Sequence, residues 1–199
     1  IENHELHNHM EKLKKKGKIK RFGFSIFSIE EANSVVNFDN ISSIQIVVNL
    51  FRQKSLKSIL KKAYKKKIAV IARGPFASGL LTGSINSKTI FPSSDHRNYN
   101  IDGKYFNISE TFSGIPLKNS LIAIKKLKEI LPRNISLIDL SLNWILQHKE
   151  VTTVIPGATH PLQIDLNYTN KKIRNLKSLN IQIDKIYNKY IKFHDYKVS

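Results

Sequence analysis

Four short apolar runs along the chain predict four buried β-strands. They cover residues 19–25, 43–50, 68–72 and 151–155. β-branched residues are frequent in the last three runs, and such side chains pack well on a pleated strand. Polar or turn-forming residues separate the runs, so we expect four distinct strands.

Segments with helical spacing lie between the first three runs. A Ser-x-x-Glu capping box at residues 28–31 predicts a helix that continues to about residue 37. A second helix is expected over residues 55–67, where apolar side chains recur at the spacing i, i+3, i+4, i+7 from Leu56. Alternating strands and helices with short connections are typical of an α/β fold with a parallel sheet and right-handed crossovers.

Outside this repeat, four helices are predicted in addition to the one that follows the last strand. The first ends at Gly17, a residue suited to the left-handed conformation that ends many helices. An apolar stripe over residues 117–131 ends at Pro132, and Ser136 is placed to cap the helix that leads to the last strand. A terminal helix beyond residue 167 is expected to cover the core.

Residues 84–116 form a long connection rich in Gly and Pro. A connection of this length in a compact domain is usually a binding loop or a lid. It contains Asp95, His96 and Arg97, residue types that are able to perform acid–base chemistry. We favour a structural or substrate-edge role for the three, because no nearby residue supplies a nucleophile or an orienting group.

The last strand leads directly into a helix. Thr159 is the predicted cap, and Pro161 stands in the first turn, where a missing N–H costs nothing. The free N–H groups and partial positive charge of such a helix start suit an anion. The same pattern is also that of an ordinary strand–helix turn, and both interpretations stay open on this segment alone.

The composition is that of one cored domain over residues 1–199. The chain is 41% hydrophobic and 24% charged, and it contains neither a long apolar run nor a signal-like N-terminus. We therefore expect no membrane association. The absence of Cys excludes disulfides, thiolate zinc sites and a Cys nucleophile, and it fits a cytoplasmic protein. The chain starts at Ile1, which suggests a fragment, a processed product or a trimmed chain.

The charge balance is strongly basic. Lys and Arg number 33 and Asp and Glu 15, a formal net charge of +18. Such a balance raises nucleic acid as a partner. The basic residues are mostly Lys in scattered clusters without interleaved aromatic residues, so a solvated surface is the favoured interpretation over specific nucleic-acid binding.

Seven segments, taken in order, resemble the C-terminal half of an aldo/keto reductase. The segments cover nearly the whole chain, and two of them, ETFSGIP and the one that contains FRQ, resemble a prokaryotic-type subgroup. They are GKIKRFGFS (17–25), IQIVVNLFRQ (44–53), IARGPFASGLLTG (71–83), SDHRN (94–98), ETFSGIP (110–116), LSLNWIL (140–146) and VIPGATHPLQIDLN (154–167).

The resemblance implies a partial (β/α)8 TIM barrel made of strands five to eight with their helices. It also implies NADP(H)-dependent reduction of an aldehyde or ketone to an alcohol, without a metal. The implied partners are a small carbonyl substrate and the missing N-terminal half of the barrel.

The resemblance also implies a set of cofactor-binding residues. Ser25 and Gln45 match the positions that bind the nicotinamide carboxamide, and Arg73 stands where many members place an aromatic residue that stacks on the ring. Ile26 replaces an Asn common beside Ser25. The pyrophosphate loop and the adenosine and 2′-phosphate site are matched by Gly74, Phe76, Ser78, Gly157, Ala158, Thr159, Gln163 and Asn167. His160 either gains charge on acidification and favours the phosphate, or points to solvent.

No catalytic residue is assigned within the chain. The family's catalytic Asp, Tyr, Lys and His belong to the first half of the barrel, which is expected to precede residue 1. His7 is an alternative catalytic His, but no apolar strand precedes it, and a surface role is favoured. Two other functions stay open: a non-catalytic nucleotide-binding or regulatory module on the same scaffold, and a basic nucleic-acid binder.

Overall fold

A parallel four-stranded sheet organises the molecule. The computed structural model describes residues 2–168 and 171–195. The strands are β1 (Gly23–Ser25), β2 (Ser43–Val47), β3 (Ala69–Arg73) and β4 (Thr153–Ile155), and they lie side by side in chain order, each parallel to the next. The four predicted strands and their parallel arrangement are therefore confirmed.

Three strands, β1, β2 and β4, are shorter than the sequence predicts, and β4 begins at Thr153 instead of Val151. β1 begins only at Gly23. There β1 and β2 approach so closely that a Cβ on residue 23 would lie 2.2 Å from the Ser43 carbonyl oxygen. β2 ends at Val47 because Asn49 turns the chain. The Asn49 side-chain oxygen accepts the N–H groups of Phe51 and Arg52 at 2.9 and 3.0 Å, a local turn that competes with strand pairing.

Helices precede, connect and follow the strands. They are α1 (Glu2–Lys15), α2 (Ile29–Val35), α3 (Lys54–Lys57), α4 (Ile59–Lys65), α5 (His96–Tyr99), α6 (Leu117–Ile130), α7 (Leu137–Leu146), α8 (Pro161–Tyr168), α9 (Leu176–Tyr190) and α10 (Lys192–Asp195). The capping box at Ser28 and Glu31 is present, and Ser136 caps α7 with Asp139 as its reciprocal partner.

The single helix predicted over residues 55–67 is wrong. The chain forms α3 and α4, separated at Ser58, whose φ of −124° and ψ of −78° are not helical. The N–H groups of Gln53 and Lys54 donate to Asp195 at 3.0 and 3.2 Å, so a distant residue fixes the start of α3. Tertiary contacts of this kind override local helix propensity.

The two faces of the sheet differ in burial. Phe24, Ile44, Ile46, Val70 and Ala72 point to the helix-covered face and are buried. On the opposite face, register partners form rows across the sheet, and most of their side chains are exposed or half-buried. One row is Ser25, Gln45, Ile71 and Thr153, and the row nearer the carboxyl edge is Val47, Arg73 and Ile155.

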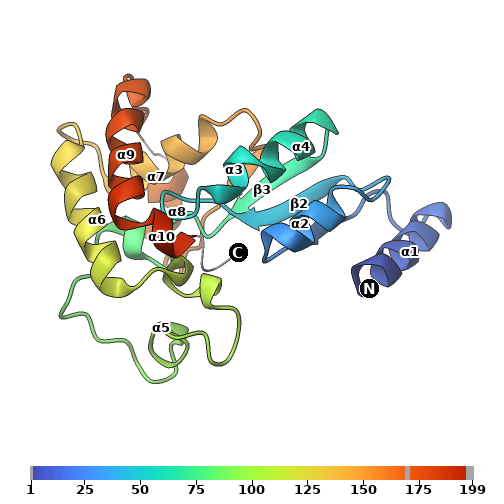
Figure 1. Cartoon of the computed structure of the whole chain (residues 1–199), viewed down its shortest axis with the longest axis horizontal. Helices are drawn as coiled ribbons and strands as arrows, with labels where there is room; N and C mark the ends of the chain where they lie inside the picture. The colour runs from blue at the N-terminus through green and yellow to red at the C-terminus, as the bar shows by residue number, and fades with distance from the viewer. Residues whose placement is uncertain (1, 169–170, 196–199) are drawn as a thin grey trace.

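The terminal helix covers part of the core, as predicted. α9 lies along α6 and buries Leu179, Ile183 and Tyr187 (Figure 1). α10 follows directly and buries Asp195. α1 lies at the other end of the molecule from α6 and α9 (Figure 1). Among the described residues, no helix has the length and apolar character needed to cross a membrane.

The long connection over residues 84–116, here called the lid, contains three short helical turns: α5, η2 (Ile108–Glu110) and η3 (Phe112–Gly114). Asp95 accepts the Arg97 N–H at 2.8 Å and pairs with the Arg97 guanidinium at 2.6 Å. The same guanidinium lies 4.5 Å from the centre of the Phe91 ring. Asp95 and Arg97 are therefore bonded within the lid.

Acid is expected to loosen the lid. The side-chain hydrogen bonds from Arg97 lower the pKa of Asp95 from 3.8 to about 2. Because this pKa is lowered on folding, the stability that Asp95 contributes is present above about pH 4 and is lost as the pH falls towards 2. Pepsin cleavage within the lid should accelerate over this range relative to an unfolded reference peptide. Asp95→Asn should be cleaved rapidly even at pH 4, and equal cleavage of variant and wild type there would contradict the role of the ion pair.

Candidate functional site

Ser25 and Gln45 form a polar pair on the open face of the sheet. They are direct register partners on β1 and β2. Neither side chain has a hydrogen-bond partner within residues 2–168 and 171–195. A hydroxyl and a primary amide both donate and accept hydrogen bonds, so the pair complements a ligand carboxamide. The structure thus brings these two predicted residues together.

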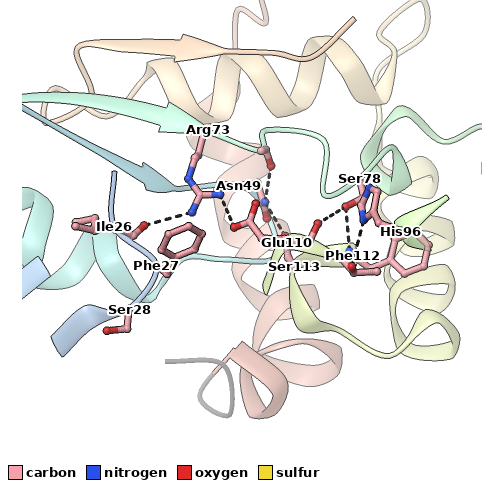
Figure 2. Close-up of polar contacts among 12 residues, drawn as sticks. Ile26, Phe27, Ser28, Asn49, Arg73, Ser78, His96, Glu110, Phe112 and Ser113 are labelled. Carbon is pink, nitrogen blue, oxygen red and sulfur yellow. Dashed lines mark hydrogen bonds and ion pairs between the residues drawn. The ribbon is translucent and has the colours of Figure 1, made fainter. Parts of the chain in front are cut away.

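Arg73 lies at the end of β3, surrounded by residues that follow β1 and by the lid. Its Nη1 pairs with the Glu110 carboxylate at 2.5 Å, and its Nη2 donates to the Ile26 carbonyl at 3.3 Å. The guanidinium carbon lies 4.9 Å from the centre of the Phe27 ring, a cation–π distance (Figure 2). The Arg73 Nε is buried without a partner. The guanidinium is therefore held in place with unused donor capacity.

The loop after β3 is fastened to the lid. Gly74 has a φ of 59°, which favours glycine, and its carbonyl accepts the Asn49 side-chain amide at 2.7 Å. Ser78 Oγ donates to the Glu110 carbonyl at 2.9 Å and accepts the Phe112 N–H at 3.1 Å (Figure 2). A ligand that uses the Ser78 hydroxyl must therefore replace a lid contact.

Phe76, predicted to line the same loop, packs into the core and is only 8% exposed. Its carbonyl accepts the N–H groups of Gly79 and Leu81 at 3.0 Å each. The side chain of Phe76 therefore anchors the loop to the hydrophobic core. Its carbonyl group is already hydrogen-bonded within the loop.

The segment after β4 is closed by side chains of α8. Gln163 Oε1 accepts the Thr159 N–H at 2.7 Å and lies 3.3 Å from the Thr159 hydroxyl. The Asn167 side-chain amide lies 3.5 Å from the Gly157 carbonyl. Gln163 and Asn167 thus face the same loop, as their spacing of four predicts. Gly157 and Ala158 are exposed, and a Cβ at Gly157 would meet nothing within 4 Å.

Thr159 was predicted to cap α8, but the residue directly before the helix is His160. The first helical residue is Pro161, so His160 immediately precedes the helix. His160 Nδ1 accepts the Leu162 N–H at 3.3 Å, which is a capping contact. A Pro in the first helical position places the cap one residue before it. The position of Pro161 in the sequence therefore indicates His160, and not Thr159, as the cap.

The side chains of His7 and His96, weighed in the sequence as acid–base groups, contact other parts of the structure. His7 Nε2 lies 2.8 Å from the Asp39 carbonyl, and the ring packs against Phe22 and Phe38, at 5.7 and 4.7 Å between ring centres. His7 is therefore a half-buried packing residue rather than the surface residue predicted. His96 Nδ1 lies 3.2 Å from Thr111 Oγ1 within the lid.

Sequence reasoning missed three residues at this edge of the sheet. Asn49 joins the Gly74 carbonyl to Ser113 Oγ, at 2.7 and 2.9 Å, and Glu110 neutralises Arg73. Glu110 and Ser113 belong to the segment ETFSGIP, which was recognised without roles for its residues. The contacts span 25 to 64 residues of sequence, so no local pattern could have identified them.

The chemistry of these groups fits a nicotinamide dinucleotide. The free pair at Ser25 and Gln45 suits a carboxamide. At the start of α8 the Leu162 N–H is already capped by His160, so a phosphate there is attracted mainly by the partial positive charge of the helix terminus. Ile155 pairs with Arg73, so the loops after β3 and β4 emerge side by side at the carboxyl edge, where barrel enzymes bind ligands. The orphaned Arg73 Nε shows that this edge has spare donor capacity.

Two curated proteins of Bacillus subtilis (strain 168) are similar in sequence. The aldo-keto reductase YhdN is 29% identical over 156 residues, which cover 78% of this chain and 45% of YhdN. The uncharacterized oxidoreductase YqkF is 30% identical over 166 residues, which cover 83% of this chain and 49% of YqkF. The chain thus spans about half the length of these curated relatives.

Solved structures share the fold. The holo form of the aldo-keto reductase AKR11C1 from Bacillus halodurans has a TM-score of 0.63 at 23% identity, over 88% of this chain and 53% of that one. The glycerol dehydrogenase AKR11B4 from Gluconobacter oxydans has a TM-score of 0.66 at 26% identity, over 93% of this chain and 54% of that one. The α/β fold with a parallel sheet therefore matches known (β/α)8 barrel structures.

The sequence pattern agrees with this likeness. The model of the aldo/keto reductase family matches residues 3–188, a span that includes all four strands and every residue assigned above to cofactor binding. The resemblance of the seven segments and the likeness of the fold thus lead to one conclusion: the chain belongs to the aldo/keto reductase family of oxidoreductases.

Proposed function

We propose that this chain is the NADP(H)-binding half of an enzyme that reduces aldehydes or ketones to alcohols. The observation that carries the proposal is the unpaired Ser25 and Gln45 pair beside Arg73 on the open face of the sheet. The bound cofactor supplies the hydride. Ser25 and Gln45 orient the carboxamide, and the loops that contain Gly74, Ser78, Gly157 and Thr159 hold the phosphates and adenosine.

The open sheet supports the second part of the proposal, that further strands complete a barrel. In the described chain, β1 pairs only with β2 and β4 only with β3, so both edges of the sheet lack a partner strand. A closed barrel of this class uses eight strands. We infer that four more strands close the barrel, bring the catalytic Asp, Tyr, Lys and His, and enclose a small carbonyl substrate between the halves.

Loss of the Gln45 amide should weaken NADPH binding. A net hydrogen bond contributes about 0.5–1.5 kcal/mol, so Gln45→Leu is expected to raise the Kd of NADPH roughly 2- to 12-fold. Isothermal titration calorimetry on the 199-residue chain measures this. Gln182→Leu is the matched control, because Gln182 is exposed on α9. No NADPH binding by the wild type, or equal Kd values for the two variants, would overturn the proposal.

The preference for NADPH over NADH should be modest. No Lys or Arg occurs from Gly157 to Tyr168, so a 2′-phosphate relies on the start of α8 and on Thr159. An exposed helix terminus contributes about 0.3–1 kcal/mol, which corresponds to a roughly 2- to 5-fold ratio of Kd values. His160 adds little, because its Nδ1 already accepts the Leu162 N–H. A ratio far above this range, or one that His160→Ala abolishes, would contradict this assignment.

A further inference from the structure

The pair formed by Arg73 and Glu110 stands close to the proposed nicotinamide position. Gln45 pairs with Ile71, and Arg73 follows two residues later on the same face of β3. Two residues along a strand correspond to roughly 7 Å. A ring whose carboxamide is bound by Ser25 and Gln45 therefore lies within reach of the electrostatic field of the Arg73 guanidinium.

The Arg73 guanidinium is shielded from solvent and held at one position beside β3. Its side chain is only 13% exposed, and both Phe27 and the Ile26 carbonyl contact the guanidinium (Figure 2). A confined charge interacts more strongly with its neighbours than an exposed one, because little water screens it. Without a counter-charge, Arg73 would present a full positive charge to any ring beside it.

Glu110 supplies that counter-charge, and it is fixed at two points. Its carboxylate pairs with Arg73 at 2.5 Å, and its carbonyl accepts the Ser78 hydroxyl at 2.9 Å. The lid residue is thus tied to the loop after β3 by both its side chain and its main chain. The nearby buried cation Arg52 has its own counter-charge, Asp195, at 3.5 Å. Glu110 is therefore the carboxylate that balances Arg73.

The oxidised and reduced cofactors differ in charge at the nicotinamide ring. The ring of NADP⁺ has a positive charge and the ring of NADPH is neutral, while the phosphates and the adenosine are the same. A bare guanidinium therefore repels the oxidised ring selectively. Contributions from the phosphates cancel in the ratio of the two affinities. The effect of the +18 net charge cancels when this ratio is compared between variants of equal net charge.

From this geometry, and resting on the function proposed above, we propose that Glu110 is the counter-charge that allows the site to hold the oxidised nicotinamide ring. By neutralising Arg73, Glu110 sets the ratio of the Kd values for NADP⁺ and NADPH. Glu110 thus tunes the redox balance of the bound cofactor through Arg73, and we class it as a positioning residue.

Calorimetric titration of the 199-residue chain with each cofactor, at one fixed ionic strength, tests the proposal. Glu110→Gln is expected to raise the Kd ratio of NADP⁺ to NADPH about tenfold, the size of an incompletely screened charge interaction. Arg73→Gln leaves the Glu110 carboxylate without its cation, and a negative charge attracts the oxidised ring. The Kd ratio of NADP⁺ to NADPH should therefore fall. The double variant should return the ratio close to that of the wild type.

Glu129→Gln is the matched control. It removes one carboxylate that pairs with Lys126 at 2.7 Å on the exposed surface of α6, so the ratio should not change. Equal ratios in Glu110→Gln and the wild type, or shifts in the same direction for Glu110→Gln and Arg73→Gln, would overturn the proposal. If the wild type binds NADPH and Gln45→Leu weakens that binding, such a result leaves the proposed function intact. A wild type that binds neither cofactor overturns both.

Discussion

Replacing Asp195 with Ala is expected to reduce the free energy of unfolding by about 3–5 kcal/mol, the usual cost of removing one partner of a buried ion pair. Asp195 is 1% exposed. Oδ2 accepts the Gln53 N–H, the Lys54 N–H and the Tyr187 hydroxyl at 3.0, 3.2 and 2.5 Å, and Oδ1 lies 3.5 Å from the Arg52 Nε. One carboxylate therefore serves four donors.

The loss is expected to be large because Arg52 remains buried. Burial already lowers the pKa of the Arg52 guanidinium, and Asp195 opposes that shift. In the Ala variant, the buried cation, the Tyr187 hydroxyl and the start of α3 all lose their acceptor at once. Urea denaturation followed by the fluorescence of Trp144 measures the change in the free energy of unfolding.

Two further variants separate the causes. Asp184→Ala is the control, because Asp184 is exposed on α9, the helix before α10, and its effect should stay within about 0.5 kcal/mol. Asp195→Asn keeps an acceptor but removes the charge, so its cost should fall between the two. A loss below about 1 kcal/mol for Asp195→Ala would show that α10 does not hold the loop after β2.

Local patterns predicted the elements whose causes are local. The four strands follow from apolar runs, and the capping box at Ser28 and the cap at Ser136 follow from short sequence signatures. The start of α3 depends on Asp195, which bonds to Gln53 across 142 positions of sequence. A pattern read over one or two helical turns contains no information on such a contact.

The candidate site divides in the same way. The adjacency of Ser25 and Gln45 was expected from the resemblance to a family, and the register places the two residues side by side. The pairing of Arg73 with Glu110 was not expected, because Glu110 lies in a three-residue helical turn of the lid whose position cannot be derived from sequence spacing. Irregular connections take their conformation from the surfaces that they contact.

The isolated 199-residue chain is expected not to reduce aldehydes. Within the described residues, the groups in contact with Arg73 are a carbonyl, a Phe ring and a carboxylate, so no Tyr, Lys or His stands there as a proton donor. Loss of a general acid alone commonly reduces a rate roughly 10²- to 10⁴-fold. NADPH oxidation with a panel of small aldehydes, followed by absorbance, should therefore remain at the buffer background.

Addition of a separately produced four-stranded half with the family's Asp, Tyr, Lys and His should restore turnover if the two halves close one barrel. The open edges at β1 and β4 provide the backbone groups for this pairing. Size-exclusion chromatography should show a complex of one copy of each half, and a Tyr→Phe change in the added half should remove the activity without removing the complex. Because both edges are unpaired, the isolated chain should associate with further copies of itself. A sharply unfolding monomer, or turnover by this chain alone at a typical enzyme rate of about 1–10³ s⁻¹, would refute the half-barrel proposal.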